Sequence, residues 1–431
     1  MDGLAAMSQY EGYKESGEGW IGKIPSHWKI RKLKHLFYEK KHTSNIDLNC
    51  GAISFGEVIT KDDDKVPLST KASYQEVLSG EILINPLNLN YDLKSLRIAL
   101  SKIDVVVSAG YIVIKEKRDI NKEYFKYLLH RYDVANMKLL GSGVRQTINF
   151  NHIANSILIL PPNHEQSAIA DFLDQKTAQI DEAIASKEKQ IELLKERKQI
   201  IIQKAVTQGL NPDVQMKDSG VDWIGRVPIN WGITKLGFAS RIGNGSTPSR
   251  ASKLFWSDGS IPWLNSSKVN DGVIKYAEQF VTRKAVKDCH LPMVSPGSIV
   301  IAITGEGKTR GMAALCEIET TINQHLAYIT VDERKFNPLF VLAYLRGMYS
   351  QIRAESSGLG STKGAITCGD LKKYFVPLPS LKEQTEIVTH IEKAMMRTEN
   401  SISLLKQQIE KLKEYKATLI NSAVTGKIKV A

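Results

Sequence analysis

The chain repeats itself, and this internal repeat limits the folds open to it more than any other feature of the sequence. Residues 16–34 read SGEGWIGKIPSHWKIRKLK, and residues 219–237 read SGVDWIGRVPINWGITKLG. A second pair of matching stretches lies at 165–207 and 383–425, where Glu-Gln opens each stretch and Ala-Val-Thr closes it. The repeats predict two similar halves, each a globular unit followed by a long helix. Such a protein suits a target that also has two similar halves, and duplex DNA is the commonest target of this kind.

The charge of the chain indicates a polyanionic partner. The sequence holds 58 Lys and Arg against 46 Asp and Glu, a formal net charge of +12 at pH 7. A basic excess of this size favours nucleic acid first and an anionic membrane second, although it also suits general solubility.

Nothing in the sequence directs the chain out of the cytoplasm. The first residues include Asp2, Glu11, Glu15 and Glu18, which does not fit a signal peptide. The longest apolar runs are too short to span a bilayer. The four cysteines are scattered without a CxxC pair, so they predict reduced thiols with neither a zinc site nor disulfides. We expect a cytoplasmic protein with no metal and no membrane contact.

Heptad repeats predict two long helices. At a and d steps, eight of ten positions from 391 to 423 are apolar, and so are seven of ten from 173 to 205. Prolines precede both stretches, and Gly209 and Gly426 follow them. Sustained 3.5-residue periodicity is typical of a coiled coil, and two matched seams in one chain most simply pack against each other. Paired antiparallel, helices of about 43 residues would form a rod of roughly 65 Å with a globular unit at each end.

Short apolar runs bounded by turn signals predict strands and short helices in both halves. The expected strands are Glu81–Ile84, Val105–Val107, Tyr111–Ile114 and Ser298–Ile303, and the expected helices are Glu123–His130 and Leu339–Tyr349. The predicted fold class is α+β: two mixed α/β globular domains separated by two long antiparallel coiled-coil helices, with an internal pseudo-twofold repeat. The expected segments, alternating domain and helix, are 1–160, 161–210, 211–378 and 379–431.

One segment suggests an enzyme. Residues 302–309 read AITGEGKT and fit a phosphate-binding loop loosely, with Ala in the first Gly position. The sequence after it leaves little room for the helix that such a loop requires, and residues 85–90 of the first half lack the Gly and Lys. No methyltransferase, protease or nuclease motif stands out, and His164, His290 and His325 are isolated, as solvated or core histidines are. We therefore expect a non-catalytic chain, with a P-loop nucleotide-binding enzyme as a less favoured alternative.

Polar, glycine-rich loops placed alike in the two halves are the best candidates for DNA contact. Residues 141–148 read GSGVRQTI and residues 358–366 read GLGSTKGAI, each just before the last expected strand of its half. Such loops can follow a groove while Arg or Gln reaches base edges. Loops at 93–97 and 244–250 and the segment at 302–310 add further candidates; the alternative is that each is an ordinary surface turn. The candidate DNA contacts are Lys94, Arg97, Arg145, Gln146, Thr147, Thr247, Arg250, Lys308, Arg310, Ser361, Thr362 and Lys363.

The repeated Trp-Ile-Gly-x-x-Pro-x-x-Trp segment at 20–28 and 223–231 has two interpretations. Its tryptophans could stack on bases. Their wide spacing and the proline between them favour instead a lid that seals each unit against the helix ends.

Together these segments resemble the specificity subunit of type I restriction–modification systems over essentially the whole chain. Members of that family carry the Trp-[Ile/Leu]-Gly-x-x-Pro-x-x-Trp segment, a Gly-x-Ile-[Leu/Val]-Ile strand before a recognition loop, and a Pro…Glu-Gln entry into a long helix. The second of these features is found here at 80–84 and 297–301, and the third at 161–166 and 377–384.

The resemblance implies that the two globular domains are target recognition domains, each reading one half of a split asymmetric site in double-stranded DNA. The helices would set the unread gap and dock two modification (methyltransferase) subunits, and restriction (motor–nuclease) subunits would be further partners. S-adenosylmethionine, and ATP with Mg, would be bound by those partners and not by this chain. The alternative is a stand-alone coiled-coil DNA-binding protein without methyltransferase partners.

Overall fold

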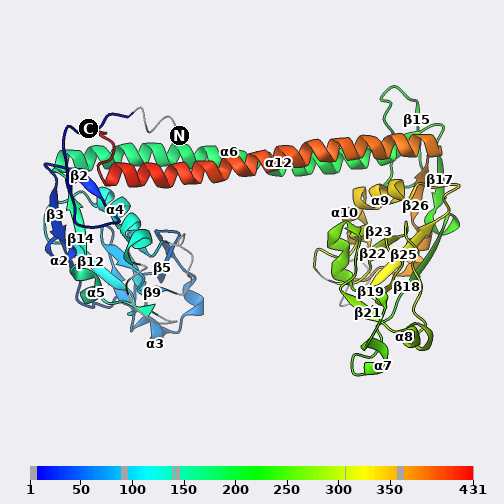
Figure 1. The fold of residues 1–431 in the computed structure, drawn as a ribbon, viewed down its shortest axis with the longest axis horizontal. Coiled ribbons are helices and arrows are strands. Elements are labelled where there is room, and N and C mark those ends of the chain that lie inside the picture. Colours follow the sequence, from blue (N-terminus) through cyan, green and yellow to red (C-terminus); the bar gives the residue numbers. More distant parts are fainter. Residues whose placement is uncertain are drawn as a thin grey trace. The chain divides into compact units, whose positions relative to one another are not determined.

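The protein consists of two compact units that share its two long helices. The structure is a computed structural model and describes residues 7–88, 96–137, 140, 146–305, 307–356 and 364–430. The first unit comprises residues 1–187 and 406–431, and the second comprises residues 188–405. Each long helix therefore begins in one unit and ends in the other (Figure 1).

The long helices are those that the heptads predict. They are α6 (Asn163–Gln208) and α12 (Leu381–Val424). Every one of the predicted seam positions is buried or half-buried, which confirms the two seams. Gly209 and Gly426 follow the helices with φ of 75° and 71°, a left-handed conformation that glycine adopts without steric strain.

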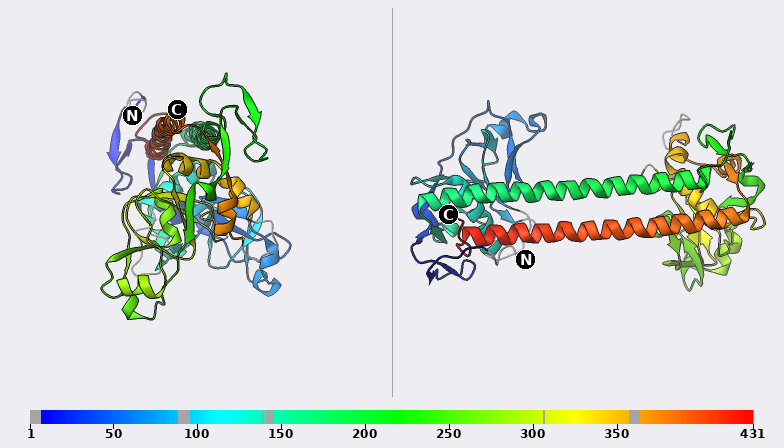
Figure 2. Two further views of the ribbon diagram at one scale, coloured as in Figure 1. Left: turned by 90° about the vertical axis from the view of Figure 1, so that its right-hand side faces the viewer. Right: turned by 90° about the horizontal axis from the view of Figure 1, so that it is seen from above.

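Polar contacts show that α6 and α12 run antiparallel within each unit (Figure 2). The contacts are Lys416 Nζ to Asp181 Oδ2 (2.7 Å) and Lys187 Nζ to Gln408 Oε1 (2.7 Å) in the first unit, and Lys198 Nζ to Glu399 Oε1 (2.6 Å) in the second. Residues later in α6 contact residues earlier in α12, as antiparallel pairing requires. The three lysines occupy seam positions, and each extends its stem along the seam to reach an oxygen of the other helix.

The first unit is built on a four-stranded antiparallel sheet packed against α4 (Lys122–Ala135). In spatial order its strands are β10 (Ile98–Leu100), β8 (Ile82–Ile84), β12 (Ile112–Glu116) and β4 (Phe37–Glu39). Five strand pairs surround it: β1 (Tyr13–Glu15) with β2 (Lys23–Pro25), β3 (Lys29–Lys32) with β14 (Ile157–Leu160), β5 (Gly51–Ser54) with β6 (Glu57–Thr60), β7 (Gln75–Val77) with β11 (Val105–Val107), and β9 (Leu87–Asn88) with β13 (Gln146–Thr147). The short helices are α2 (Leu33–Leu36), η1 (Asp63–Lys65), α3 (Leu68–Lys71) and α5 (Phe150–Ala154).

The second unit is built on a five-stranded sheet packed against α9 (Pro338–Gly347). In spatial order its strands are β18 (Ser240–Asn244), β25 (Leu326–Val331), β22 (Ile299–Ala302), β23 (Ala313–Cys316) and β20 (Val273–Ile274). The other strands are β15 (Met216–Asp218) with β16 (Arg226–Pro228), β17 (Gly232–Lys235) with β26 (Phe375–Leu378), and the sheet of β21 (Gln279–Val281), β19 (Ile261–Leu264) and β24 (Thr321–Ile322). The remaining helices are η3 (Leu236–Phe238), α7 (Lys253–Trp256), η4 (Ser266–Asp271), α8 (Arg283–Asp288), α10 (Tyr349–Glu355) and α11 (Cys368–Lys373).

The two units follow one plan, which confirms the internal repeat and the mixed α/β class. The order β4-β12-β8-β10 in the first unit corresponds to β18-β25-β22-β23 in the second, and the pair β3–β14 corresponds to β17–β26. The expected strand at 105–107 is β11. The single helix expected at 339–349 is instead α9 and α10, because the helix is interrupted at Met348.

The repeated tryptophan segment seals each unit against the helix ends. Trp28 is fully buried, and its indole Nε1 donates to Glu165 of α6 at 2.9 Å. In the second unit Trp231 is equally buried, and its Nε1 donates to Glu383 of α12 at 3.3 Å. A Cβ on Gly426 would lie 3.0 Å from the Trp28 ring, so the end of α12 also packs on this lid. Trp28 and Trp231 thus have the structural role that their spacing favours.

The Glu-Gln pair that opens each long helix has a second structural role. Its glutamate binds the buried tryptophan, and its glutamine binds the N-cap of another helix. Gln166 accepts from the backbone N–H of Asn121 at 2.9 Å, and Asn121 is the N-cap of α4. Gln384 accepts in the same way from Asn337, the N-cap of α9, at 2.7 Å. Each glutamine therefore ties the start of a long helix to the start of the helix that covers the sheet.

Candidate nucleic-acid interface

In the second unit, the loops that the sequence marks as candidate DNA contacts converge at one place. The N–H of Ile366 donates to the carbonyl of Ile303 at 2.8 Å, and Thr304 forms an isolated antiparallel bridge with Ala365. The segment 364–366 therefore lies beside the hairpin loop that follows β22. The loop at 244–250 is connected to the same place through Gln324 and His325. Thr247 Oγ1 hydrogen-bonds to Gln324 Oε1, and the neighbouring His325 hydrogen-bonds to Thr304.

The first unit repeats this arrangement with different side chains. Its strand β13 pairs with β9, Gln146 opposite Asn88 and Thr147 opposite Leu87. The N–H of Ile148 donates to the carbonyl of Pro86 at 3.2 Å, which matches the contact between Ile366 and Ile303. Both units thus bring the loop after the central strand (β8 or β22) against the segment before a short helix (α5 or α11).

A polar cluster links these loops in the second unit. His325 Nδ1 lies 2.6 Å from Thr304 Oγ1, and its Nε2 lies 3.1 Å from Gln324 Nε2. Gln324 and His325 are exposed in the turn between β24 and β25. Neither residue is among the DNA contacts predicted from the sequence, because only the fold brings this turn beside Thr247 and Thr304.

Lys308 is exposed in the loop between β22 and β23. Side chains of α10 hydrogen-bond to the backbone of this loop. The Tyr349 hydroxyl donates to the carbonyl of Lys308 at 2.5 Å, and Arg353 Nη1 donates to the carbonyl of Gly307 at 2.6 Å. After residue 310 the chain enters strand β23 and not a helix. A phosphate-binding P-loop requires a helix at this point, so the geometry does not support a nucleotide site.

Arg250 is exposed, and its guanidinium is held by two aromatic rings. Its Cζ lies 3.8 Å from the centroid of Trp256 and 4.8 Å from that of Trp263, and Nη2 donates to Gln279 Oε1 at 2.7 Å. Stacking on tryptophan orients the planar fork of an arginine before it meets a ligand. This arrangement suits recognition of a guanine edge or a phosphate.

Two of the predicted contacts have structural positions instead. Arg97 is only 6% exposed, and its Nε donates to Asp133 Oδ1 at 3.0 Å. Asp133 Oδ2 also accepts from the backbone N–H of Arg97 at 2.5 Å. Arg310 is 5% exposed. Both arginines lie beside loops but point into the unit, so we correct their assignment as surface contacts.

The remaining predicted contacts can be placed only in part. Gln146 and Thr147 lie in β13, where the structure describes their backbone. Five predicted contacts lie outside the described residues: Lys94, Arg145, Ser361, Thr362 and Lys363.

The pair formed by Arg97 and Asp133 leads to a stability prediction. We expect Asp133→Leu to lower the free energy of unfolding of the first unit by about 3–5 kcal/mol, because it leaves the buried Arg97 guanidinium without this carboxylate. The double variant Arg97→Met/Asp133→Leu should recover part of the loss, since apolar side chains can replace a buried ion pair at little cost, while the backbone N–H of residue 97 still lacks its acceptor. Chemical unfolding followed by circular dichroism measures both. A double variant no more stable than Asp133→Leu would contradict the assignment.

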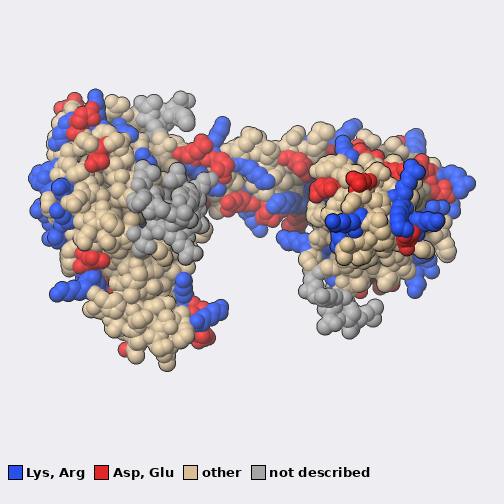
Figure 3. All heavy atoms as spheres, turned by 60° about the horizontal axis from the view of Figure 1, so that its bottom comes forward, with Lys and Arg blue, Asp and Glu red and all other residues tan. Residues whose placement is uncertain are grey.

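The charged surface does not form one large basic patch on the face shown in Figure 3. Lys and Arg side chains of the described residues alternate there with Asp and Glu on both units. The basic excess is therefore dispersed on this face, and the loops must supply specific contacts one side chain at a time.

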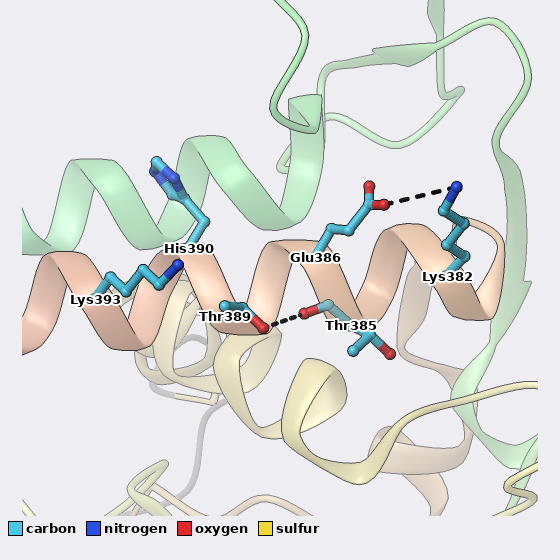
Figure 4. Close-up of a pocket in the computed structure, with 6 residues that line it drawn as sticks. All are labelled: Lys382, Thr385, Glu386, Thr389, His390 and Lys393. Atoms are coloured by element: carbon cyan, nitrogen blue, oxygen red, sulfur yellow. Dashed lines mark hydrogen bonds and ion pairs between the residues drawn. The ribbon is translucent and has the colours of Figure 1, made fainter.

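A polar groove of about 600 Å³ lies on α12 in the second unit (Figure 4). Its lining residues are Lys382, Thr385, Glu386, Thr389, His390 and Lys393. All come from one helix, and their mutual contacts are those of an exposed helix surface: Lys382 to Glu386 at 4.0 Å and Thr389 Oγ1 to the Thr385 carbonyl at 2.9 Å. This groove has no arrangement of nucleophile, base and acid.

Two kinds of feature are absent from the described part of the chain. No group of three or more His, Cys, Asp or Glu side chains there is placed to hold a metal ion. None of the helices described has the length and apolar character needed to cross a membrane.

Two repeated α/β units on shared antiparallel helices, with polar loops gathered alike in both, define a class of two-part DNA specificity protein. The chain belongs to the family described as the type I restriction modification DNA specificity domain, whose model matches residues 25–193 and 228–414. Membership makes it the specificity subunit of such a system and agrees with the resemblance seen in the sequence. Neither the stand-alone coiled-coil protein nor the P-loop enzyme is supported.

Similar proteins match two thirds or more of the chain. A protein of Methanocaldococcus jannaschii assigned as the MjaX specificity subunit of a type I restriction enzyme is 26% identical over 430 residues, which are 95% of this chain and 96% of that protein. The EcoR124I/EcoR124II specificity subunit of Escherichia coli is 26% identical over 307 residues, 68% of each chain.

Solved structures show the same fold. A chain from a study of complex assembly and conformational transition in a type I R-M system superposes with a TM-score of 0.69 at 16% identity, covering 93% of this chain and 98% of that one. The HsdS subunit from Thermoanaerobacter tengcongensis superposes with a TM-score of 0.54 at 16% identity, covering 94% and 98%.

Proposed function

We propose that each unit reads one half of a split asymmetric site in double-stranded DNA. The observation that supports this most directly is the loop arrangement common to both units, in which Ile148 bonds to Pro86 and Ile366 to Ile303. The backbone arrangement of these loops is shared, but the side chains that they carry differ between the two units. Two such loop arrangements with different side chains would read two different half-sites.

The proposed DNA contacts come from the loops that form this arrangement and from the segments next to them in the sequence. In the second unit Arg250 is oriented for a base edge or a phosphate, and Lys308 supplies a charge for the backbone. Thr247, Gln324 and His325 form the polar surface between them. In the first unit the proposed contacts are Gln146 and Thr147 of β13, together with Lys94 and Arg145; Ser361, Thr362 and Lys363 complete the set in the second unit.

The chain itself is proposed to be non-catalytic and to act through its partners. The helices would fix the spacing between the half-sites and dock two methyltransferase subunits, which bring S-adenosylmethionine. Restriction subunits would bring ATP with Mg. The protein would act in the reducing cytoplasm, where the DNA is found. Its cysteines are free thiols, as is usual there: Cys50, Cys289, Cys316 and Cys368.

Mapping methylated adenines in the host genome tests this function. We expect a recurring site with two specified parts and an unread gap, and we expect its methylation to disappear when the gene for this chain is deleted and to return when the gene is restored. Deletion of the gene for the partner methyltransferase should have the same effect. Methylation unchanged by loss of this chain, or a continuous site without a gap, would contradict the proposal.

A further inference from the structure

The β5–β6 hairpin of the first unit presents an aromatic side chain to solvent at its tip. Ser54 pairs with Glu57, so Phe55 and Gly56 form a two-residue turn. Phe55 is 92% exposed, the most exposed of the large hydrophobic side chains described. The fold gains almost nothing from this ring, because nearly all of its surface stays in water.

The backbone at Phe55 makes this residue a costly choice. Phe55 has φ of 49° and Gly56 has φ of 81°. Positive φ at both central residues is the pattern of a type I′ turn, in which Asn, Asp or Gly is favoured at the first position. A bulky side chain with positive φ is sterically disfavoured. Folding alone would therefore select Asn-Gly here, and residues kept in disfavoured conformations cluster at functional sites.

The hairpin is supported on one side, so the turn that carries the ring is held in place. Ile53 of β5 and Val58 of β6 pack on the buried cluster that includes Val105 and Val107. At the tip, a Cβ on Gly56 would lie 2.7 Å from the side chain of Leu96 and 3.2 Å from that of His130. Burial lowers the pKa of His130 to about 4, so a neutral imidazole packs under the turn at neutral pH.

The same contact places the tip at the border of the candidate interface. Leu96 is followed by Arg97, whose carbonyl accepts from the N–H of Asn85 at 2.8 Å, and Asn85 lies two residues before β9, which pairs with β13 and its predicted DNA contacts. β5 and β9 lie on the same side of the first unit in Figure 1. An exposed ring on the side of the unit that carries β9, beside strands proposed to contact DNA, has the position of an apolar wedge, a device by which proteins contact and partly unstack base steps.

We propose that Phe55 is an aromatic wedge that packs against the base stack of the DNA half-site bound by the first unit. The inference rests on the proposed function, because it takes duplex DNA as the occupant of this surface. The ring adds contact with base faces, which strengthens binding without adding charge. It also favours half-sites with an easily unstacked pyrimidine–purine step at that position.

Binding measurements on the full chain assembled with its methyltransferase subunits test the wedge. The probe is a duplex with the site mapped for the wild-type complex, and a duplex of scrambled sequence measures non-specific affinity. We expect Phe55→Ala to weaken binding to the mapped site about tenfold. The salt dependence should stay unchanged, since no phosphate contact is lost. Permanganate reactivity of a thymine in the first half-site should fall in the same variant.

Phe55→Asn separates a wedge from a structural residue. It suits the positive φ, so we expect the melting temperature of the complex to stay the same or rise while binding weakens as in Phe55→Ala. Phe238→Ala is the matched control, because Phe238 is 75% exposed and belongs to η3 of the second unit, whereas the hairpin belongs to the first. It should bind as the wild type does.

Three results would overturn the inference. Phe55→Ala and Phe55→Asn could bind the mapped site as tightly as the wild type. They could lose methyltransferase subunits on gel filtration, which would make the ring a protein contact. The third is a wild-type complex that shows no preference for any sequence; that result would remove the proposed function itself, and it is seen before any variant is made.

Discussion

Replacing residues 219–378 with the corresponding segment of a family member that methylates a different site should change one half of the methylated sequence and leave the other half as it was. The exchanged segment holds every strand of the second unit except β15 (Met216–Asp218), which stays with the recipient and pairs with β16. The pair formed by β17 and β26, which joins the beginning and the end of the segment, lies entirely inside it. The cores around Trp231 and Trp263 are also built within the second unit. The new unit therefore brings its own loops, including those around Arg250 and Lys308.

The donor should be chosen by the contacts that cross the two joints. Trp231 bonds to Glu383 and Asn337 bonds to Gln384, and both acceptors stay with the recipient helix α12. A donor with Trp and Asn at these positions keeps both contacts, so the exchanged unit can dock on the helix as the original does. A donor without them would confuse loss of docking with loss of recognition.

Sequencing that detects methyladenine in the host genome measures the outcome. The reciprocal exchange of residues 16–160 is the control and should change only the other half of the site. A hybrid that methylates a sequence altered in both halves, or in neither, would show that the units do not read DNA independently.

The parts of this fold that depend on local pattern can be predicted from the sequence. The seams of α6 and α12 follow from heptad spacing, because the same side chains must be buried whichever helix covers them. Their ends follow from the prolines before them and from Gly209 and Gly426 after them. The role of Trp28 follows from its repetition at Trp231 with the same spacing to a proline.

The candidate site depends on contacts between distant residues, and there the prediction from sequence is incomplete. Arg97 stands in a polar loop in the sequence, but its partner Asp133 lies 36 residues further along the chain. No local pattern reveals that this arginine is buried. His325 is isolated in the sequence and meets Thr304 only because β22 and β25 are neighbours in the sheet.

The β5–β6 hairpin shows a different limit. Ser-Phe-Gly-Glu at 54–57 lacks the Asn-Gly or Asp-Gly signal of a tight hairpin, so the turn is not predicted. A functional demand for an aromatic ring would explain why the local rule is broken at Phe55. Disagreement between local preference and observed conformation is then a guide to function.

Lengthening both long helices at facing positions should lengthen the unread gap between the two half-sites. We expect four helix-forming residues inserted after Lys187 and four more after Leu405 to increase the gap by one or two base pairs, with both half-sites unchanged. Each insertion adds about 6 Å of helical rise, which equals roughly two base pairs of B-DNA at about 3.4 Å each. The two points are where α6 and α12 pass from one unit to the other, so the pairs on either side keep their partners.

Inserting in both helices matters because they are antiparallel partners. An insertion in α6 alone would shift Lys198 away from Glu399 while Lys187 stayed beside Gln408. Four residues in a heptad seam are absorbed by local unwinding, so the paired insertion should remain helical. Circular dichroism of the purified variant checks this before its methylation is mapped.

The same four residues inserted after Asn211 are the matched control. Asn211 is exposed in the turn that follows α6, where added residues do not lengthen either helix. This variant should methylate the original site with the original gap. If the paired insertion also leaves the gap unchanged while both helices stay folded, the helices do not determine the spacing, and the loops or the partner subunits must do so.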